Sequence, residues 1–498
     1  MSTPDGKLAR SVAWAGLESG LSLAISVGSV VIVARFLGAS EFGLGALAHG
    51  LLQIPLVLVG SLVHDALVQR PDLSAGHLRA ARSGSLWAGG VLLVIVVASA
   101  PLLAAFFEEP RLALLIAALA PLLLFEAVSA PLLGLRRRAL DFGSVARRLL
   151  AGRGLGALAG ILAAAAGARA WAVVVQQLVA AATIAALSLR DAPTGPRARF
   201  ERDAFAELVR FCRPIVAVQL LIQGSERLFL AYVGHQLGMA AAGYWSLAVR
   251  LVENVASVVA TALYHVGLAF MSRLQQDRAA LALRLEEAVR HLMLVTVPAV
   301  AALLVGADLL ILLAVGPGWL AAALPVQILA LGAMLLLRRL LPTVALTAAG
   351  RPRANLDAYL AENATTLPLL FLLGPLALPT VAALRAGRSA LGWAVVTAAA
   401  ARGLDRPLRR ELGGLAVDLA GLGLGLAAGT AVRLALEARF QEPLVVLLGA
   451  APTAALVAAG VILVLRPALA RSLAGQVRAL FGRPAGAAEA VRAVGRGR

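Results

Sequence analysis

Long apolar stretches recur along this sequence, and they constrain its fold more than any other feature. They return from Val12 to Arg466, and a helix needs roughly 20 apolar residues to cross a bilayer. Hydrophobic residues make up 60% of the chain, charged residues make up 14%, and the mean hydropathy is +0.87. Soluble domains are about 45–50% apolar and about 25% charged. The composition therefore excludes a soluble globular protein and indicates a polytopic membrane protein.

The apolar stretches are rich in Leu, Ala and Val and do not alternate every second residue, so we expect membrane helices rather than a closed barrel. The 498 residues accommodate about 14 such helices. The first stretch is longer than a signal-peptide core and lacks a clear cleavage site, so it is expected to be retained. The predicted spans are 12–36, 42–64, 83–107, 111–135, 149–168, 170–189, 211–234, 240–270, 288–313, 319–349, 355–377, 387–403, 413–436 and 444–466.

Basic residues are distributed unevenly between the connections. The 45 Lys and Arg residues exceed the 27 Asp and Glu residues, which gives a net charge of +18. With the N-terminus in the cytoplasm, most basic residues fall in cytoplasmic connections and in the tail, as the positive-inside rule requires. The outer connections then hold only Arg111, Arg169, Arg385, Arg388 and Arg439. We therefore expect both termini in the cytoplasm and an even number of spans, and we do not expect a nucleic-acid partner.

One short motif occurs twice with the same internal spacing. Leu37, Gly38, Gly43, Leu47 and Ala48 recur as Leu237, Gly238, Gly243, Leu247 and Ala248. Two weaker repeats follow in the same order, and each pair falls on one side of the predicted membrane. We therefore expect two six-helix lobes that are parallel repeats, with the substrate between them. The predicted organisation is an N-lobe at 1–208, a C-lobe at 209–403, two additional helices at 404–466 and a basic cytoplasmic tail at 467–498.

Polar residues inside the predicted spans fall on single helical faces. An ionisable group facing lipid at a helix centre costs about 2.5–3.5 kcal/mol, so these faces are expected to meet protein or a water-filled cavity. Steps of three and four residues define each face. The faces are Ser246, Arg250, Glu253, Ser257, Thr261 and Tyr264 in the eighth span; Gln219, Gln223 and Glu226, with Arg227 beside them, in the seventh; Glu18, Ser22, Ser26 and Ser29 in the first; and Asn355, Tyr359, Glu362 and Thr366 in the eleventh. For any single residue, helix packing or a neutralised pair such as Arg250 with Glu253 is the alternative.

Sequence signatures of enzymes are absent. There is no P-loop, no HExxH motif and no Gly-rich phosphate loop, and no cytoplasmic connection is long enough for a nucleotide-binding domain. Cys212 is the one cysteine, which excludes an intramolecular disulfide, and the histidines do not have a metal-binding spacing. We therefore expect no catalytic residues, no cofactor and no metal, and an ATP-driven pump within this one chain is excluded.

Several motifs resemble those of bacterial polysaccharide exporters. Val33–Gly43 is similar to their ARxLGPxxFG opening, with Ala39 where proline is usual. Glu226–Leu228 stands where that family has Asp-Arg-Leu, and Gly243–Ala248 resembles its GYYSxA. The match continues at Ala66–Arg70, Leu135–Arg137 and Trp171–Leu178 and extends to about residue 403. The chain is thus similar to Wzx-like lipid-linked oligosaccharide flippases of the multidrug/oligosaccharidyl-lipid/polysaccharide (MOP) exporter superfamily.

The resemblance implies alternating access around a central cationic cavity lined by the first, second, seventh and eighth spans. It implies that the cargo is a polyprenyl-diphosphate-linked sugar or oligosaccharide, moved across the bacterial plasma (inner) membrane for surface polysaccharide biosynthesis. The implied partners are membrane lipids and polysaccharide polymerase or export proteins. Because guanidinium groups match phosphate oxygens, Arg227 and Arg250 are predicted to pair with the diphosphate. The residues predicted to bond sugar hydroxyls are Gln219, Gln223, Ser246, Ser257 and Thr261, and those predicted to balance charge or couple an ion are Glu18, Glu226, Glu253 and Glu362.

Two other functions remain open at this stage. A cation-coupled multidrug exporter of the same superfamily would bind its substrate with carboxylates, whereas the predicted cavity is positively charged. A membrane-embedded glycosyltransferase or polysaccharide polymerase would present acidic residues on a sizeable outer loop. The outer connections are short, and Glu108 with Glu109 is their one acidic pair.

Overall fold

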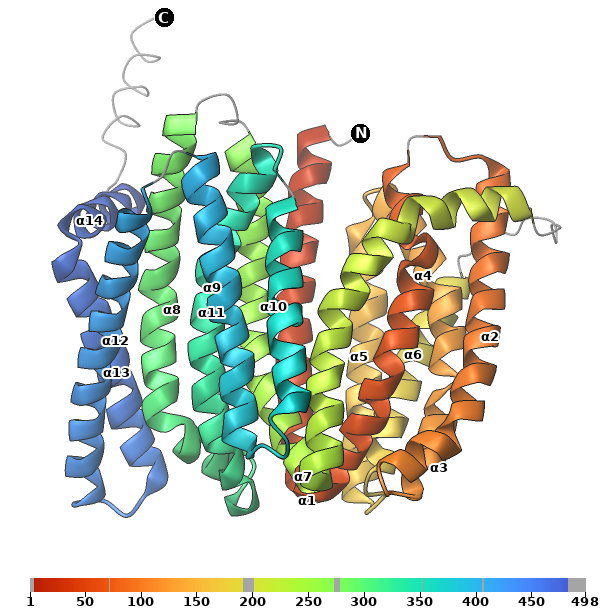
Figure 1. Cartoon of the computed structure of the whole chain (residues 1–498), viewed down its shortest axis with the longest axis horizontal. Coiled ribbons are helices and arrows are strands. Elements are labelled where there is room, and N and C mark those ends of the chain that lie inside the picture. The colour runs from red at the N-terminus through yellow and green to blue at the C-terminus, as the bar shows by residue number, and fades with distance from the viewer. Residues whose placement is uncertain are drawn as a thin grey trace, which may run out of the picture. The chain divides into compact units, whose positions relative to one another are not determined.

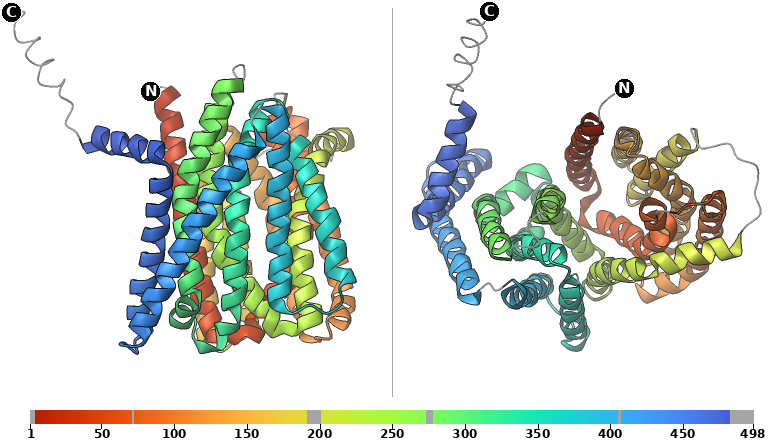
Figure 2. Two further views of the ribbon diagram at one scale, coloured as in Figure 1. Left: turned by 60° about the vertical axis from the view of Figure 1, so that its left-hand side comes forward. Right: turned by 90° about the horizontal axis from the view of Figure 1, so that it is seen from above.

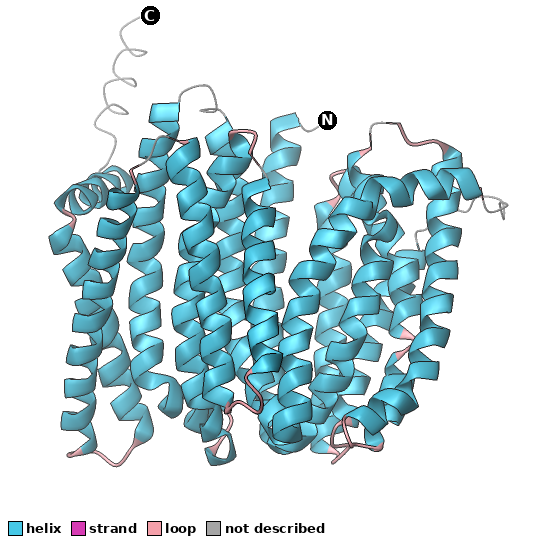
Figure 3. Cartoon of the chain, in the orientation of Figure 1, coloured by secondary structure: helices cyan, strands magenta, loops and turns pink. Residues whose placement is uncertain are grey.

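The computed structural model describes residues 4–70, 72–190, 201–272, 278–351, 353–404 and 407–481 (Figure 1). Within these ranges the regular structure is helical throughout, without a strand (Figure 3). Nine of the helices described there are long and apolar enough to cross a membrane. The predicted all-α membrane fold is confirmed, and the count of about 14 spans stays a prediction.

Each predicted span overlaps at least one helix. The helices of the first half are α1 (Pro4–Gln69), α2 (Ala75–Phe106), α3 (Arg111–Leu119), α4 (Leu122–Arg138), α5 (Phe142–Ala165), α6 (Trp171–Arg190) and α7 (Arg202–Ser272). They are followed by α8 (Arg278–Ala314), the short 3-10 helix η1 (Pro317–Ala322), α9 (Ala323–Ala348), α10 (Arg353–Leu372), α11 (Leu378–Gly403), α12 (Leu408–Glu437), α13 (Pro443–Leu465) and α14 (Pro467–Phe481).

The helices group into two compact units. The first unit comprises Met1–Phe270 and Ala307–Ala399, and the second comprises Met271–Gly306 and Ala400–Arg498. The first unit therefore contains α1 to α7 together with α9, α10 and most of α11. All the residues of the candidate site described below belong to the first unit.

Two long helices of the first unit, α1 and α7, each bend sharply at a glycine. Gly38 has a φ of 73° and Gly238 a φ of 83°, in the left-handed region that residues with a Cβ atom rarely adopt. Both glycines belong to the duplicated motif. Figure 1 shows the two bends at the same end of the first unit. Each bend turns the chain back, so that α1 and α7 each consist of two helical arms, and each arm contains one of the predicted spans.

Glycines spaced four residues apart hold two helix pairs close together. They are Gly152, Gly156 and Gly160 on α5, and Gly421, Gly425 and Gly429 on α12. A Cβ atom added to Gly156 would lie 2.6 Å from the carbonyl oxygen of Gln176 on α6. One added to Gly425 would lie 2.6 Å from the carbonyl oxygen of Ala454 on α13. Small residues let membrane helices approach to backbone contact, and this explains why α5 pairs with α6 and α12 with α13.

In the second unit, an ion pair fixes the corner between α13 and α14. Nη2 of Arg466, at that junction, lies 2.9 Å from Oδ1 of Asp418 and donates to the carbonyl oxygen of Gly414 at 2.7 Å. Asp418 is fully buried, so its charge requires a partner. Figure 2 shows α14 running crosswise to α13 from this corner.

Candidate functional site

A cavity of about 250 Å³ lies in the first unit, between α1, α7, α9, α10 and α11. The charged residues among its described lining are five arginines and three glutamates: Arg227, Arg250, Arg339, Arg385 and Arg388, and Glu226, Glu253 and Glu362. Charged groups within membrane helices are rare and generally face each other or water. Their convergence from four helices makes this cavity the candidate site.

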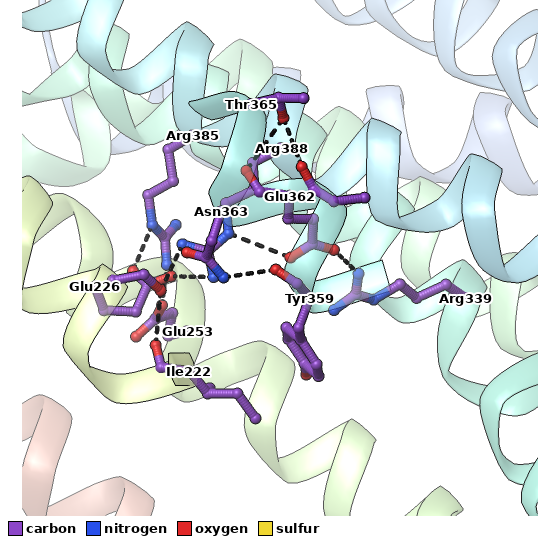
Figure 4. Close-up of polar contacts among 12 residues, drawn as sticks. Ile222, Glu226, Glu253, Arg339, Tyr359, Glu362, Asn363, Thr365, Arg385 and Arg388 are labelled. Atoms are coloured by element: carbon purple, nitrogen blue, oxygen red, sulfur yellow. Dashed lines mark hydrogen bonds and ion pairs between the residues drawn. The ribbon is translucent and has the colours of Figure 1, made fainter. Parts of the chain in front are cut away.

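Arg385 of α11 bridges two glutamates of α7 (Figure 4). Its Nε donates to Oε2 of Glu226 at 2.7 Å, and its Nη2 donates to Oε1 of Glu253. The two glutamates lie on opposite sides of the α7 bend at Gly238. One guanidinium group therefore joins the two arms of α7 to each other and to α11.

Glu362 of α10 is bound from two sides (Figure 4). Nε of Arg388 donates to its Oε2 at 3.3 Å, and Nη1 of Arg339 donates to its Oε1. Arg388 also donates to the hydroxyl of Ser225 at 3.0 Å, and its Nη2 lies 3.2 Å from Oε1 of Glu226. The side chains of Arg339 and Glu362 are only 4% and 2% exposed. Arg388 thus links a buried ion pair to the more open pairs of Arg385.

The buried pair of Arg339 and Glu362 depends on its neighbours for space and for support. A Cβ atom added to Gly392 of α11 would collide with both charged groups, so a larger residue there would require the two side-chain ends to shift. The Arg339 guanidinium lies 4.9 Å from the centre of the Tyr359 ring, within the range of a cation–π interaction. Packing from α10 and α11 therefore fixes this part of the wall.

Arg227 and Arg250 differ from the other three arginines because, among the described residues, neither makes an ion pair. Nε of Arg227 is buried without a hydrogen-bond partner, and so is the hydroxyl of Ser246 in the cavity wall. Arg250 lies over Phe42, 6.0 Å from the ring centre. Buried polar groups without partners are costly. These groups are therefore available to a ligand in a way that Arg339, Arg385 and Arg388 are not.

The residues predicted from the sequence have different positions. Arg227, Arg250, Gln223, Ser246, Glu226, Glu253 and Glu362 all contribute to the cavity lining. Gln219 is exposed and lies outside that lining. Glu18 accepts hydrogen bonds from Arg153 at 3.0 Å and from Ser22 at 2.9 Å, away from the cavity. Ser257 and Thr261 fall in α7, but their side chains lie outside the described part of the structure.

Arg385 and Arg388 require a correction to the predicted topology, which placed both in the outer connections. A turn with Gly374 at a φ of 74° is followed by α11, which begins at Leu378, so both arginines lie inside a helix. Hydropathy fails here because two charges interrupt the apolar run, while their carboxylate partners lie on other helices. Their spacing of three residues, which puts both on one helical face, was the signal that could have identified them.

Comparisons with known proteins agree with the expected family and fold. A family model described as "Polysaccharide biosynthesis protein" matches residues 32–324. The structure of the "Lipid II flippase MurJ, inward closed conformation" matches with a TM-score of 0.73 at 13% identity, covering 93% of this chain and 99% of that one. An inward-facing multidrug resistance MATE family transporter of the MOP superfamily matches with a TM-score of 0.61 at 13% identity, covering 78% and 96%. No curated protein matches the sequence. At this identity the two structures show the fold alone, which this chain shares with both.

Proposed function

The chain belongs to the polysaccharide biosynthesis protein family, and on that basis we propose that it moves a polyprenyl-diphosphate-linked sugar or oligosaccharide across the bacterial plasma membrane. The diphosphate and the sugar hydroxyls of such a lipid cannot enter hydrocarbon without large desolvation costs. A protein that moves it must therefore supply a polar, positively charged passage for the head, while the chain stays in an apolar environment.

The charge balance of the cavity carries the proposal. Within the described lining, the three glutamates are bound by Arg339, Arg385 and Arg388. Arg227 and Arg250 remain, each without an anionic partner among the described residues. A diphosphate diester carries two negative charges, and guanidinium groups bind phosphate oxygens through paired hydrogen bonds. The two unpaired cations are therefore proposed to bind the two phosphates.

The polar residues beside these arginines are proposed to bind the sugar. The Ser246 hydroxyl has no hydrogen-bond partner among the residues that the structure describes, and Gln223 lines the same cavity. Ser257 and Thr261 continue the helical face of Ser246, and Gln219 that of Gln223, at steps of three and four residues. In this scheme Glu226, Glu253 and Glu362 neutralise arginines in the empty state, while an ion-coupling role for Glu18 rests on its place in the first predicted span.

We further propose that transport proceeds by alternating access of two lobes, 1–208 and 209–403, with 404–466 and the 467–498 tail added to them and both termini in the cytoplasm. The glycine bends at Gly38 and Gly238 support the duplication, because the repeated motif has the same unusual backbone conformation in both copies. The supply of a lipid-linked sugar to a polysaccharide polymerase or export protein would follow on the outer face.

The alternative function, that of a cation-coupled multidrug exporter, fits the cavity less well. A cationic substrate needs carboxylates that are free to bind it. In the described lining each of Glu226, Glu253 and Glu362 already accepts from at least one arginine. The two unpaired arginines would also repel a cation.

The test is translocation of a lipid-linked oligosaccharide in vesicles by Arg227→Ala, Arg250→Ala and the double variant. Each single change is expected to slow translocation by about tenfold or more, because a hydrogen bond to a charged group contributes about 1.5–3 kcal/mol. Arg284→Ala is the matched control, since Arg284 pairs with Glu287 on the exposed part of α8. Unchanged translocation in the double variant at normal protein level would contradict the proposal.

A further inference from the structure

A second cavity, of about 350 Å³, opens between α10 and α11 in the first unit. Its wall includes Thr366 and Leu369 of α10, and Ala383, Leu384, Gly387 and Leu391 of α11. The volume falls within the range of roughly 300–1,000 Å³ that is typical of small-ligand pockets. We refer to it as the α10–α11 groove.

The wall of the α10–α11 groove is suited to hydrocarbon. Its aliphatic members offer no hydrogen bonds, and the hydroxyl of Thr365 donates to the carbonyl oxygens of Ala361 at 2.8 Å and Glu362 at 3.2 Å (Figure 4). That hydroxyl is therefore satisfied by its own helix. A Cβ atom added to Gly387 would meet no atom within 4 Å, so the space beside this glycine is open.

Arg388 is shared by the groove and the polar cavity, because it belongs to the lining of both. Its three guanidinium nitrogens are engaged by Glu362, Ser225 and Glu226, so the charge is neutralised on the side of the polar cavity. An amphiphile can thus place a polar head on one side of Arg388 and an apolar chain on the other without burying an unpaired charge.

We propose that the α10–α11 groove binds the first isoprene units of the polyprenyl chain while the diphosphate occupies the arginine cavity. This inference rests on the proposed function and adds the site of the apolar part of the substrate. An apolar groove and a cationic cavity that share Arg388 in their walls favour a single ligand that is anionic at one end and apolar at the other. For a soluble isoprenoid probe, the binding energy of the chain would come from apolar area removed from water.

Two soluble probes separate the chain from the head: inorganic pyrophosphate, which has no chain, and farnesyl diphosphate, which has three isoprene units. Binding of each to the purified full-length protein is measured by calorimetry. We expect the wild type to bind farnesyl diphosphate at least about tenfold more tightly than pyrophosphate, since each buried CH₂ group adds to the affinity. Gly387→Leu fills the groove and is expected to remove this preference while leaving pyrophosphate binding unchanged.

The matched control is Gly154→Leu on α5. An added Cβ atom there also meets no atom within 4 Å, and Gly154 does not belong to the described lining of either cavity. It should keep both affinities.

The thermal unfolding midpoint shows whether Gly387→Leu still folds. If it does not, a second variant, Leu384→Ser, tests the groove instead, because it makes the wall polar without filling the groove. Equal losses for both probes, or a wild type without preference for farnesyl diphosphate, would overturn the inference. Failure of pyrophosphate to bind, with farnesyl diphosphate still bound and sensitive to Gly387→Leu, would instead contradict the role of the arginines alone. Displacement of farnesyl diphosphate by excess phosphatidylcholine would assign the groove to any acyl chain and overturn its isoprenoid assignment.

Discussion

Gly43 of α1 and Gly243 of α7 lie against each other just beyond the two helix bends. A Cβ atom on Gly43 would lie 2.6 Å from the backbone nitrogen of Gly243 and would collide with the carbonyl oxygen of Met239. One on Gly243 would collide with the backbone of Ala39. The two copies of the duplicated motif therefore meet backbone to backbone, at the end of the first unit where both helices turn.

Replacing Gly43 with alanine is expected to destabilise the protein by about 1–3 kcal/mol, the usual cost of overpacking, because the obstructing atoms are backbone and cannot rotate away. The thermal unfolding midpoint in detergent measures the effect. Gly28→Ala, also on α1, is the control, since an added Cβ atom there meets no atom within 4 Å. Alanine is the better helix former, so Gly28→Ala should keep or raise the midpoint. Equal midpoints for Gly43→Ala and the wild type would contradict the close contact.

Glu253→Gln is expected to tighten the binding of pyrophosphate. The Glu253 side chain is 45% exposed, and its negative charge opposes the approach of a phosphate to the neighbouring Arg227 and Arg250. Charge interactions of a half-exposed group contribute about 0.2–1 kcal/mol, so the gain should be about 1.4- to fivefold. Titration calorimetry on the purified protein measures it. Glu287→Gln, which removes an exposed carboxylate on α8, should change nothing. Weaker binding of pyrophosphate by Glu253→Gln would mean that Glu253 stabilises the binding site and does not oppose the phosphate.

Glu362→Gln should act on stability instead. Its side chain is 2% exposed and is bound by Arg339 and Arg388. Removing one charge from a buried pair leaves the partner uncompensated, at a cost of about 3–5 kcal/mol. The unfolding midpoint is expected to fall sharply, and Arg339→Met added to Glu362→Gln should restore part of the loss. A double variant less stable than Glu362→Gln would argue that Arg339 is stabilised by Tyr359 rather than by the carboxylate.

An ion-pair cluster at the start of α7 gives a pH-dependent prediction. Oε2 of Glu207 accepts from Nε2 of His77 at 2.8 Å and from Nη1 of Arg70 at 3.0 Å. These hydrogen bonds, first that of His77 and then that of Arg70, hold the pKa of Glu207 below its usual value. A carboxyl group whose pKa is depressed by folding stabilises the protein above its unfolded-state pKa of about 4.3, and that contribution is lost as the pH falls through the folded-state pKa.

The wild type should therefore unfold at a higher temperature than Glu207→Gln near pH 7, and the two midpoints should converge below about pH 4. The difference is expected to be small, because the Glu207 side chain is 50% exposed and water screens the pairs. A difference that persists unchanged at acid pH would assign the effect of the substitution to packing and not to charge.

Local patterns in the sequence were sufficient to predict which faces of the two arms of α7 are internal. Arg227, Arg250 and Glu253 follow helical spacing on otherwise apolar spans, and the cost of exposing charge to lipid requires an internal face. Those three line the cavity. The same argument identified an inward face at Glu18, but a partner on α5, Arg153, satisfies that charge away from the cavity. Periodicity finds the internal face of a helix and does not identify the partner that meets it.

Arg385 and Arg388 escaped prediction for the opposite reason. Counting basic residues assigns each arginine to a connection, because a single helix gives no sign of a distant carboxylate. Glu226 lies 159 residues before Arg385 along the chain, and only the folded structure brings them together. The place of Arg339 likewise follows from the fold, because its burial beside Glu362 puts it in the cavity wall.

The glycine seams between α5 and α6 and between α12 and α13 restrict how this protein can move. Where two backbones touch without intervening side chains, there are no rotamers to rearrange, and separating the pair would open an empty gap. Each pair should accordingly travel as one rigid body. The deformation of the proposed transport cycle then falls on parts of the chain outside these two helix pairs.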